Sequence, residues 1–178
     1  LEDGADYVFL LNNDTTTEPD TISALVHAAV QHPEAGLLTP VIHHHDRPAE
    51  TWFAGSRIDL SRGVAVHDNS SPPPRDADVR EIPWASGCAM LIPAKLIEQV
   101  GGFDERFFLN WEDVDLSLRV RAAGRSVLLV PSARIYHKVS RSLNGNAALG
   151  RYYHVRNQLL LMTLHARRFA AQGRPTVF

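Results

Sequence analysis

The most informative stretch of this sequence runs from Gly101 to Leu116 and reads GGFDERFFLNWEDVDL. The glycine pair at its start is a typical helix stop, so it predicts the end of a short helix over Ala94–Val100. The acidic cluster at its far end opens a second helix, which is predicted from Glu112 to Ala123 and ended by Gly124. The stretch is therefore a loop between two helices that carries acidic and aromatic side chains.

Two carboxylates of this stretch are candidates for chemistry. With Asn110 as the predicted N-cap, Glu112 and Asp113 fall in the first helical turn, where the helix dipole favours the ionised form and should hold the pKa down. An ionised carboxylate can act as a general base toward a hydroxyl group. The alternative is that Asp113 only completes a capping arrangement. Asp115 is assigned to an ion pair with Arg119, four residues further along the helix.

Strands alternate with helices along the rest of the chain, which predicts an α/β fold with a mixed, mainly parallel sheet flanked by helices. The first strand, Tyr7–Leu11, is an apolar run that predicts burial on both faces. The length fits one domain over residues 1–178. The other predicted strands cover 36–42, 51–58, 84–92, 126–130 and 133–137, and the other predicted helices cover 18–32 and 147–171.

Composition excludes several classes of protein. A net charge of −2 and a pI near 6.5 leave no basic footprint for nucleic acid. No apolar run is long enough for a membrane span. The single cysteine, Cys88, cannot form an internal disulfide and is assigned to the core, which favours a reducing compartment such as the cytoplasm. Since the chain begins at Leu1 with no initiator Met, we expect it to start inside a longer protein.

Polar residues follow the first predicted strand directly. Asn12, Asn13 and Asp14 stand at its carboxyl end, where ligands of open α/β sheets bind. A carboxylate at this position can bind a divalent cation, which in turn neutralises a diphosphate. The alternative is a simple strand-to-helix turn, because Asn and Asp favour turns.

Histidines supply a second set of candidate ligands. His137 ends the last predicted strand, and a neutral imidazole suits Mn, Zn or Fe. A structural role is the alternative, since isolated histidines at strand ends are usually structural. The run from His43 to His45 is assigned to a surface loop, and residues 67–80, which include three consecutive prolines, are assigned to an exposed loop.

Taken together, these segments resemble the family 2 inverting glycosyltransferases, particularly the rhamnosyltransferase-like branch. The resemblance covers nearly the whole chain, and its most specific part is the Gly101–Leu116 stretch. The other matching segments are Phe9–Asp14, Trp84–Ile92, Ile135–His137 and Tyr152–Asn157.

The resemblance implies a GT-A fold, a role in cell-wall polysaccharide assembly, and a set of site residues. Asp14 matches the last acid of the family's metal-binding Asp-x-Asp motif, in which Asn12 here replaces the first acid, and His137 matches a histidine that can complete a site for Mn or Mg. Asp113 matches the catalytic base. The implied substrate-binding residues are Asn12, Asn13, Trp84, Ser86, Gly87, Trp111 and Glu112, with Trp111 placed to stack on a sugar.

The implied reaction transfers a sugar, with inversion, from a nucleotide-sugar donor to a glycan or lipid-linked acceptor. The implied location is the cytoplasm, at the inner face of the membrane where the protein associates with it peripherally. The chain lacks the front half of the family's nucleotide-binding domain, so we expect it to be the metal- and acceptor-binding portion, inactive by itself. The Tyr7–Leu11 strand should then have an unpaired edge, which can promote homo-oligomers.

Two other functions fit the same residues. A non-catalytic carbohydrate-binding fragment would bind glycans without a divalent metal. A metal-dependent phosphoester hydrolase would need more ligands than Asp14 and His137 supply.

Overall fold

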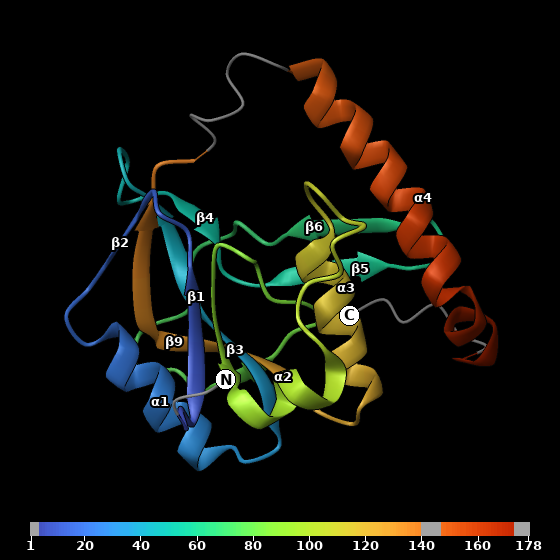
Figure 1. Cartoon of the computed structure of the whole chain (residues 1–178). Coiled ribbons are helices and arrows are strands. Elements are labelled where there is room, and N and C mark those ends of the chain that lie inside the picture. The colour runs from blue at the N-terminus through green and yellow to red at the C-terminus, as the bar shows by residue number, and fades with distance from the viewer. Residues whose placement is uncertain (1–3, 140–146, 173–178) are drawn as a thin grey trace.

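The computed structural model describes residues 4–139 and 147–172, with residues 166–172 described by their backbone alone. It is a mixed sheet flanked by helices, so the predicted α/β class is confirmed (Figure 1). The strands are β1 (Tyr7–Leu11), β2 (Thr15–Thr17), β3 (Ala35–His44), β4 (Thr51–Phe53), β5 (Ser56–Asp59), β6 (Val64–His67), β7 (Arg80–Glu81), β8 (Ala89–Pro93) and β9 (Ser126–His137). The helices are α1 (Thr21–Gln31), α2 (Ala94–Val100), α3 (Glu112–Ala122) and α4 (Ala147–Gln172).

The main sheet has the strand order β1-β8-β3-β9-β2. β3 and β9 pair in parallel over most of their length, and β1 runs in the same direction because both β1 and β3 are antiparallel to β8. The short strands β2, β4, β7 and β8 run the opposite way. The carboxyl ends of β1, β3 and β9 therefore point toward the same end of the sheet.

Each face of this sheet is covered by helices. Adjacent residues of β3 point to opposite faces of the sheet. Leu37 and Leu38 are both fully buried, but they belong to different core clusters. Leu38 packs with Leu25 of α1, whereas Leu37 packs with Val114 and Leu116 of α3. Two buried faces favour apolar residues along the central strands, and β3 and β9 are buried at nearly every position, with Thr39 and Arg134 among the polar exceptions.

Strands β2, β6 and β7 and the start of α1 at Thr21 were not predicted, and four other boundaries differ from the sequence-based prediction. The predicted strand over 51–58 is two strands, because Gly55 adopts a φ of +135° between β4 and β5. The predicted strands on either side of Pro131 are one strand, since Val130 pairs with Pro40 and Arg134 with the next residue of β3, and residues 131–133 bulge out of the ladder.

The other two differences concern β3 and β8. His43 and His44 belong to β3 and not to a loop, and His43 is buried. Regular pairing of β8 begins only at Ala89, so residues 84–88 approach the sheet as an irregular segment. β1 is half-buried and pairs with β8 alone among the described residues, which makes it an edge strand and not a strand buried on both faces.

The longest helix, α4, lies across the β5–β6 hairpin and α3, away from the main sheet (Figure 1). Gln158 Nε2 donates to the Gly63 carbonyl of the hairpin at 2.8 Å, and His165 Nε2 lies 2.8 Å from Asp115 Oδ1 of α3. In the part of the chain that the structure describes, no helix has both the length and the apolar character needed to cross a bilayer.

Candidate active site

Asp14 and His137 are brought together at the carboxyl end of the sheet. β2 pairs with β9 so that Thr15 lies opposite His137. The Lys138 N–H donates to the Asp14 carbonyl oxygen at 3.0 Å. As a result, Asp14 Oδ1 lies 3.1 Å from His137 Nε2. Burial lowers the pKa of His137, although the Asp14 carboxylate opposes this, and a neutral imidazole is the form that binds metal ions.

The Asn12-Asn13-Asp14 segment is also a turn. Thr15 Oγ1 donates to the Asn12 carbonyl oxygen at 2.6 Å, and the Asn12 N–H donates to the Cys88 carbonyl oxygen at 2.9 Å. Both asparagine residues are exposed. The turn interpretation and the ligand interpretation are therefore compatible, since the backbone turns while the Asp14 side chain lies beside an imidazole.

Asp113 is held at the start of α3 by backbone donors. Its Oδ2 accepts the Gly87 N–H at 2.9 Å, and its Oδ1 accepts the N–H of Val114 at 2.8 Å. Ser117 Oγ donates to the Asp113 carbonyl oxygen at 2.8 Å and accepts the Ala85 N–H at 3.1 Å. The segment before β8 and the first turn of α3 are thus fixed to each other.

Gly87 is the position that allows this close approach. A Cβ atom added there would lie 3.2 Å from the Asp113 Cβ and 3.6 Å from its Oδ2. Ser86 is buried, and its Oγ accepts the Cys88 N–H at 3.3 Å, so this hydroxyl shapes the turn. Of the predicted residues in this segment, Gly87 is therefore the one in direct contact with the candidate base.

The first turn of α3 does not have the predicted cap. Asn110 and Trp111 both adopt left-handed backbone conformations, with φ of +66° and +75°, and Trp111 occupies the N-cap position with no side-chain capping bond. Asn157 of α4 holds this segment, because its Nδ2 donates to the Leu109 and Asn110 carbonyl oxygens at 2.8 and 2.9 Å. These bonds hold the loop before α3 but do not cap the helix, because a cap accepts from the N–H groups of the first turn.

The expected low pKa values of the two carboxylates are wrong in direction. Burial, followed by the charge of Asp113, raises the pKa of Glu112 to about 7. Burial also raises the pKa of Asp113, although the N–H donors of Gly87 and Val114 oppose this. Desolvation therefore outweighs the helix terminus. Within the described residues, Glu112 Oε2 is buried without a hydrogen-bond partner.

Asp14 and Asp113 converge on the segment that contains Cys88. The Cys88 carbonyl accepts the Asn12 N–H, while the preceding residue, Gly87, donates to Asp113. Burial, followed by the charges of Asp14 and then Asp113, raises the pKa of the Cys88 thiol to about 12. Two carboxylates that are distant in the sequence thus act on the same thiol. Cys88 is buried, as predicted.

Aromatic rings connect the two carboxylate sites. The Trp52 ring lies 4.7 Å from the His137 ring and 4.5 Å from the His67 ring, and His67 in turn lies 5.2 Å from Trp84. Burial lowers the pKa of His67 to about 4, so this ring is neutral. A cavity of about 170 Å³ continues from this wall to the carboxylates, lined by Ala65, His67, Trp84, Asn110, Trp111, Glu112, Asp113, Val114 and His154.

The predicted tryptophans are part of the cavity wall. Trp84 is 3% exposed, and its Nε1 donates to the Arg57 carbonyl oxygen at 3.3 Å. Trp111 is 5% exposed, packs 5.3 Å from the His154 ring, and has a buried Nε1 without a partner in the described residues. Both residues line the cavity, and neither presents an open ring face at the surface.

Sequence reasoning missed two residues of this site and gave two others no role. Trp52 and His67 belong to none of the patterns that indicate chemistry, and their place in the site depends on how β4 and β6 pack. His154 and Asn157 lie in a segment that had been matched to the family. Asp115, by contrast, pairs with Arg119 as predicted, at 2.8 Å, and is buried beside His165.

The fold is the GT-A fold of glycosyltransferases. A crystal structure of GalNAc-T7 with UDP, GalNAc and Mn²⁺ superposes with a TM-score of 0.58 at 14% identity, over 74% of this chain and 27% of that one. At that identity the likeness shows the fold alone. The family model described as "Glycosyltransferase like family 2" matches residues 4–173.

The chain belongs to glycosyltransferase family 2. It is 35% identical over 156 residues to the N-acetylglucosaminyl-diphospho-decaprenol L-rhamnosyltransferase of Mycobacterium tuberculosis, a match that covers 80% of this chain and 50% of the relative. It is also 31% identical over 149 residues to the O-antigen biosynthesis protein RfbC of Myxococcus xanthus, covering 79% of this chain and 11% of that protein. The chain thus spans about half the length of the mycobacterial relative.

Proposed function

We propose that the protein containing this chain transfers a sugar, with inversion, from a nucleotide-sugar donor to a glycan or lipid-linked acceptor. One observation carries the proposal: Asp14 and Asp113 flank the Gly87–Cys88 segment at the carboxyl end of the sheet, with a cavity beside Asp113. The name of the mycobacterial relative supports a lipid-diphosphate acceptor. The chain itself would form the metal- and acceptor-binding portion of the domain, at the cytoplasmic face of the membrane.

Asp113 is the proposed base. The acceptor hydroxyl would lose its proton to the Asp113 carboxylate while its oxygen forms a bond to the anomeric carbon, and the bond from that carbon to the diphosphate oxygen breaks. A buried carboxylate with a raised pKa suits this step, because a base is most effective when its pKa is near the working pH. The Gly87 and Val114 N–H groups fix its orientation.

Asp14 and His137 fit a divalent cation as a pair of ligands. Their Oδ1 and Nε2 atoms already converge within 3.1 Å, and a mixed oxygen and nitrogen donor set suits Mn²⁺. Residues 4–139 and 147–165 hold no cluster of three or more His, Cys, Asp or Glu side chains suited to a metal ion. The diphosphate and water would therefore complete the coordination. Such a cation would stabilise the negative charge of the departing diphosphate.

The test uses Asp113→Asn in the full-length protein, with Asp104→Asn as the matched control in an exposed turn. We expect Asp113→Asn to lower transfer by about a hundredfold or more, in keeping with the loss of a general base, and to leave donor binding nearly unchanged. Transfer by Asp113→Asn at the wild-type rate would disprove the base assignment.

A second variant separates the metal role from the base. Asp14→Ala should weaken donor binding in the presence of Mn²⁺ and leave the smaller, metal-free affinity unchanged, as measured by calorimetry with and without EDTA. Equal affinity of wild type and variant in Mn²⁺ would remove Asp14 as a ligand. Glycan binding that requires no metal, with no turnover in any variant, would favour a non-catalytic carbohydrate-binding protein.

A further inference from the structure

One face of α4 holds the helix on the rest of the molecule. Asn157, Leu161 and His165 are at most 4% exposed and follow one another at intervals of four residues, which places them on the same side of the helix. They contact the loop before α3, the main core cluster and Asp115. This inner face is fully occupied by contacts within the chain.

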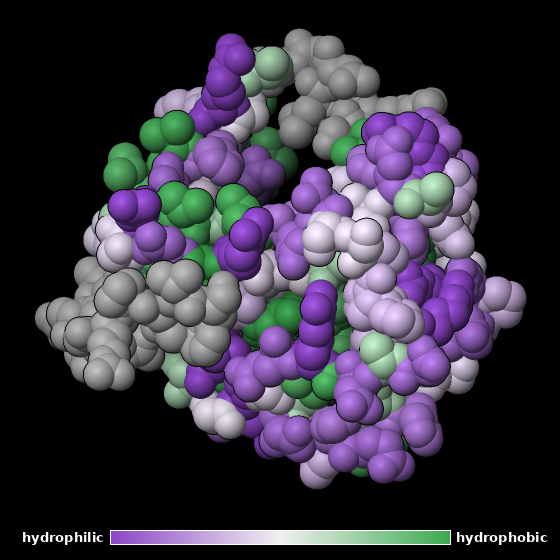
Figure 2. Space-filling model, turned by 180° about the vertical axis from the view of Figure 1, so that it is seen from behind, coloured by the Kyte–Doolittle hydropathy of each residue, from purple (hydrophilic) through white to green (hydrophobic). Residues whose placement is uncertain are grey.

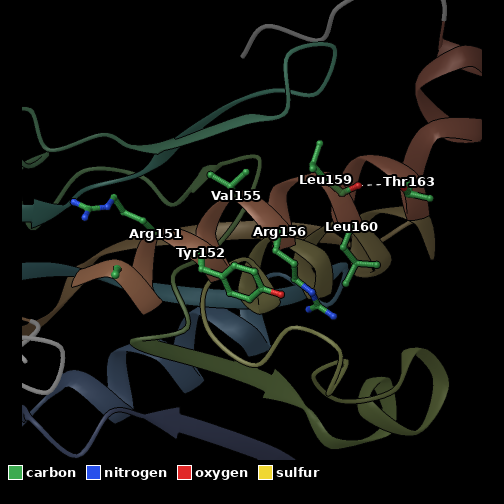
Figure 3. Close-up of a pocket in the computed structure, with 8 residues that line it drawn as sticks. Arg151, Tyr152, Val155, Arg156, Leu159, Leu160 and Thr163 are labelled. Carbon is green, nitrogen blue, oxygen red and sulfur yellow. Dashed lines mark hydrogen bonds between the residues drawn. The ribbon is translucent and has the colours of Figure 1, made fainter. Parts of the chain in front are cut away.

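The opposite face of α4 is apolar and exposed. Tyr152, Val155 and Leu159 are 61%, 54% and 60% exposed, and they line a groove of about 710 Å³ along the helix together with Ala148 and Thr163. Val155 and Leu159 point together to one side of the helix, whereas Tyr152 and Arg156 point to the other (Figure 3). Seen from behind, apolar residues reach the surface along the edge of the molecule that α4 forms (Figure 2).

Charge is distributed unevenly between α4 and the rest of the chain. The sequence of α4 contains four arginines and no Asp or Glu. The chain has 18 basic and 20 acidic residues in all, which leaves 14 basic against 20 acidic residues outside α4. Arg151 and Arg156 lie beside the apolar groove. A helix with exposed apolar side chains and only positive charge is complementary to an anionic, apolar partner.

We propose that this outer face of α4 docks on the surface of an anionic phospholipid bilayer. Val155 and Leu159 would enter the region between the headgroups and the acyl chains, and Arg151 would lie among the phosphates. Since no described helix can cross a membrane, α4 would lie in the plane of the surface. The inference rests on the proposed function for the kind of acceptor, whereas the docking itself depends only on α4.

The experiment measures co-sedimentation of the full-length protein with two kinds of vesicle, without donor or acceptor. One kind contains phosphatidylcholine alone and the other equal parts of phosphatidylcholine and phosphatidylglycerol. Wild type should bind the anionic vesicles, and less so as salt is added. The double variant Val155→Asp/Leu159→Asp should weaken this binding by about tenfold or more, because both apolar anchors are lost. Arg151→Glu should weaken it by a smaller factor.

Ile22→Asp/Val30→Asp is the matched control, since both side chains are exposed apolar residues of α1. It should bind vesicles as wild type does. Melting curves establish that each variant folds. Donor hydrolysis without a lipid acceptor should be unchanged in Val155→Asp/Leu159→Asp. A failure of docking is therefore distinguishable from a failure of the proposed reaction. Equal vesicle binding by wild type and the α4 variant would overturn the proposal. So would a wild-type protein that ignores vesicles but forms dimers that Val155→Asp/Leu159→Asp separates.

Discussion

At the scale of single residues, the site depends on carboxylates whose protonation is set by burial. Glu112 stands beside Asp113 in the first turn of α3, and the negative charge of Asp113 adds to burial in making the ionised form of Glu112 more costly. The sequence showed the pair and the helix start, but not the degree of burial, which depends on how Trp84 and α4 cover the turn. Position alone therefore gave the wrong sign for the pKa shift.

The raised pKa of Glu112 predicts a dependence of stability on pH. The folded protein holds this proton up to about pH 7, whereas the unfolded chain releases it near 4.5. Between these values the folded state binds more protons, so stability falls as the pH rises through the window. Glu112→Gln should remove this fall and be more stable than wild type above pH 7 by on the order of 2 kcal/mol. Urea unfolding of wild type and Glu112→Gln at several pH values measures this difference in the free energy of unfolding.

Glu105→Gln is the control for this experiment, because Glu105 is exposed in the same loop. It should follow the wild-type curve throughout. Parallel stability curves for wild type and Glu112→Gln across the whole window would show that Glu112 is ionised at its ordinary pKa in the folded protein.

At the scale of elements, α4 positions the start of α3. The left-handed conformations of Asn110 and Trp111 are costly for residues other than glycine, and for the bulky Trp111 more than for Asn110. The two hydrogen bonds from Asn157 offset part of this cost and fix the direction in which Asp113 leaves the loop. The orientation of the proposed base thus depends on a helix that begins more than thirty residues after Asp113.

Asn157→Ala should therefore affect activity more than stability. Losing two hydrogen bonds to carbonyl oxygens is expected to cost roughly 1–3 kcal/mol of unfolding free energy. The rate of sugar transfer should fall by more than the smaller fraction of folded protein explains, and this fall should appear in kcat. The matched control is Gln158→Ala, which loses one bond from α4 to the β5–β6 hairpin and none to α3. Equal kcat values for the two variants, both measured well below their melting temperatures, would contradict the positioning role.

Most elements could be predicted from sequence, and the exceptions share a cause. Apolar patterns and glycine stops located β1, α2, α3 and α4 to within a residue or two, because these signals are local. The break at Gly55, the bulge after Val130 and the late start of β8 depend on pairing with distant strands. Likewise, motifs indicated Asp14, His137 and Asp113 as candidates, whereas Trp52 and His67 lie beside the site only through packing.

At the scale of the whole molecule, the sheet ends at β1. This strand pairs with β8 on one side, and on its other side the described residues provide no partner. Unpaired backbone groups on an edge strand favour association with another strand. In a protein as long as the mycobacterial relative, which is twice the matched length, further strands could cover this edge.

We therefore expect the isolated 178-residue chain to self-associate, and the full-length protein to do so less. Analytical ultracentrifugation of both over a range of concentrations measures this. A monomeric isolated chain at every concentration would show that this edge is blocked by its own side chains.

The position of Cys88 has a practical consequence. It is the only cysteine in the sequence, and a thiol whose pKa is about 12 is almost entirely protonated at neutral pH and therefore slow to react. Because the thiol is also buried, alkylating reagents reach it only when the surrounding structure opens locally. The rate of alkylation, followed by mass spectrometry, therefore reports how often the segment between Asp14 and Asp113 opens.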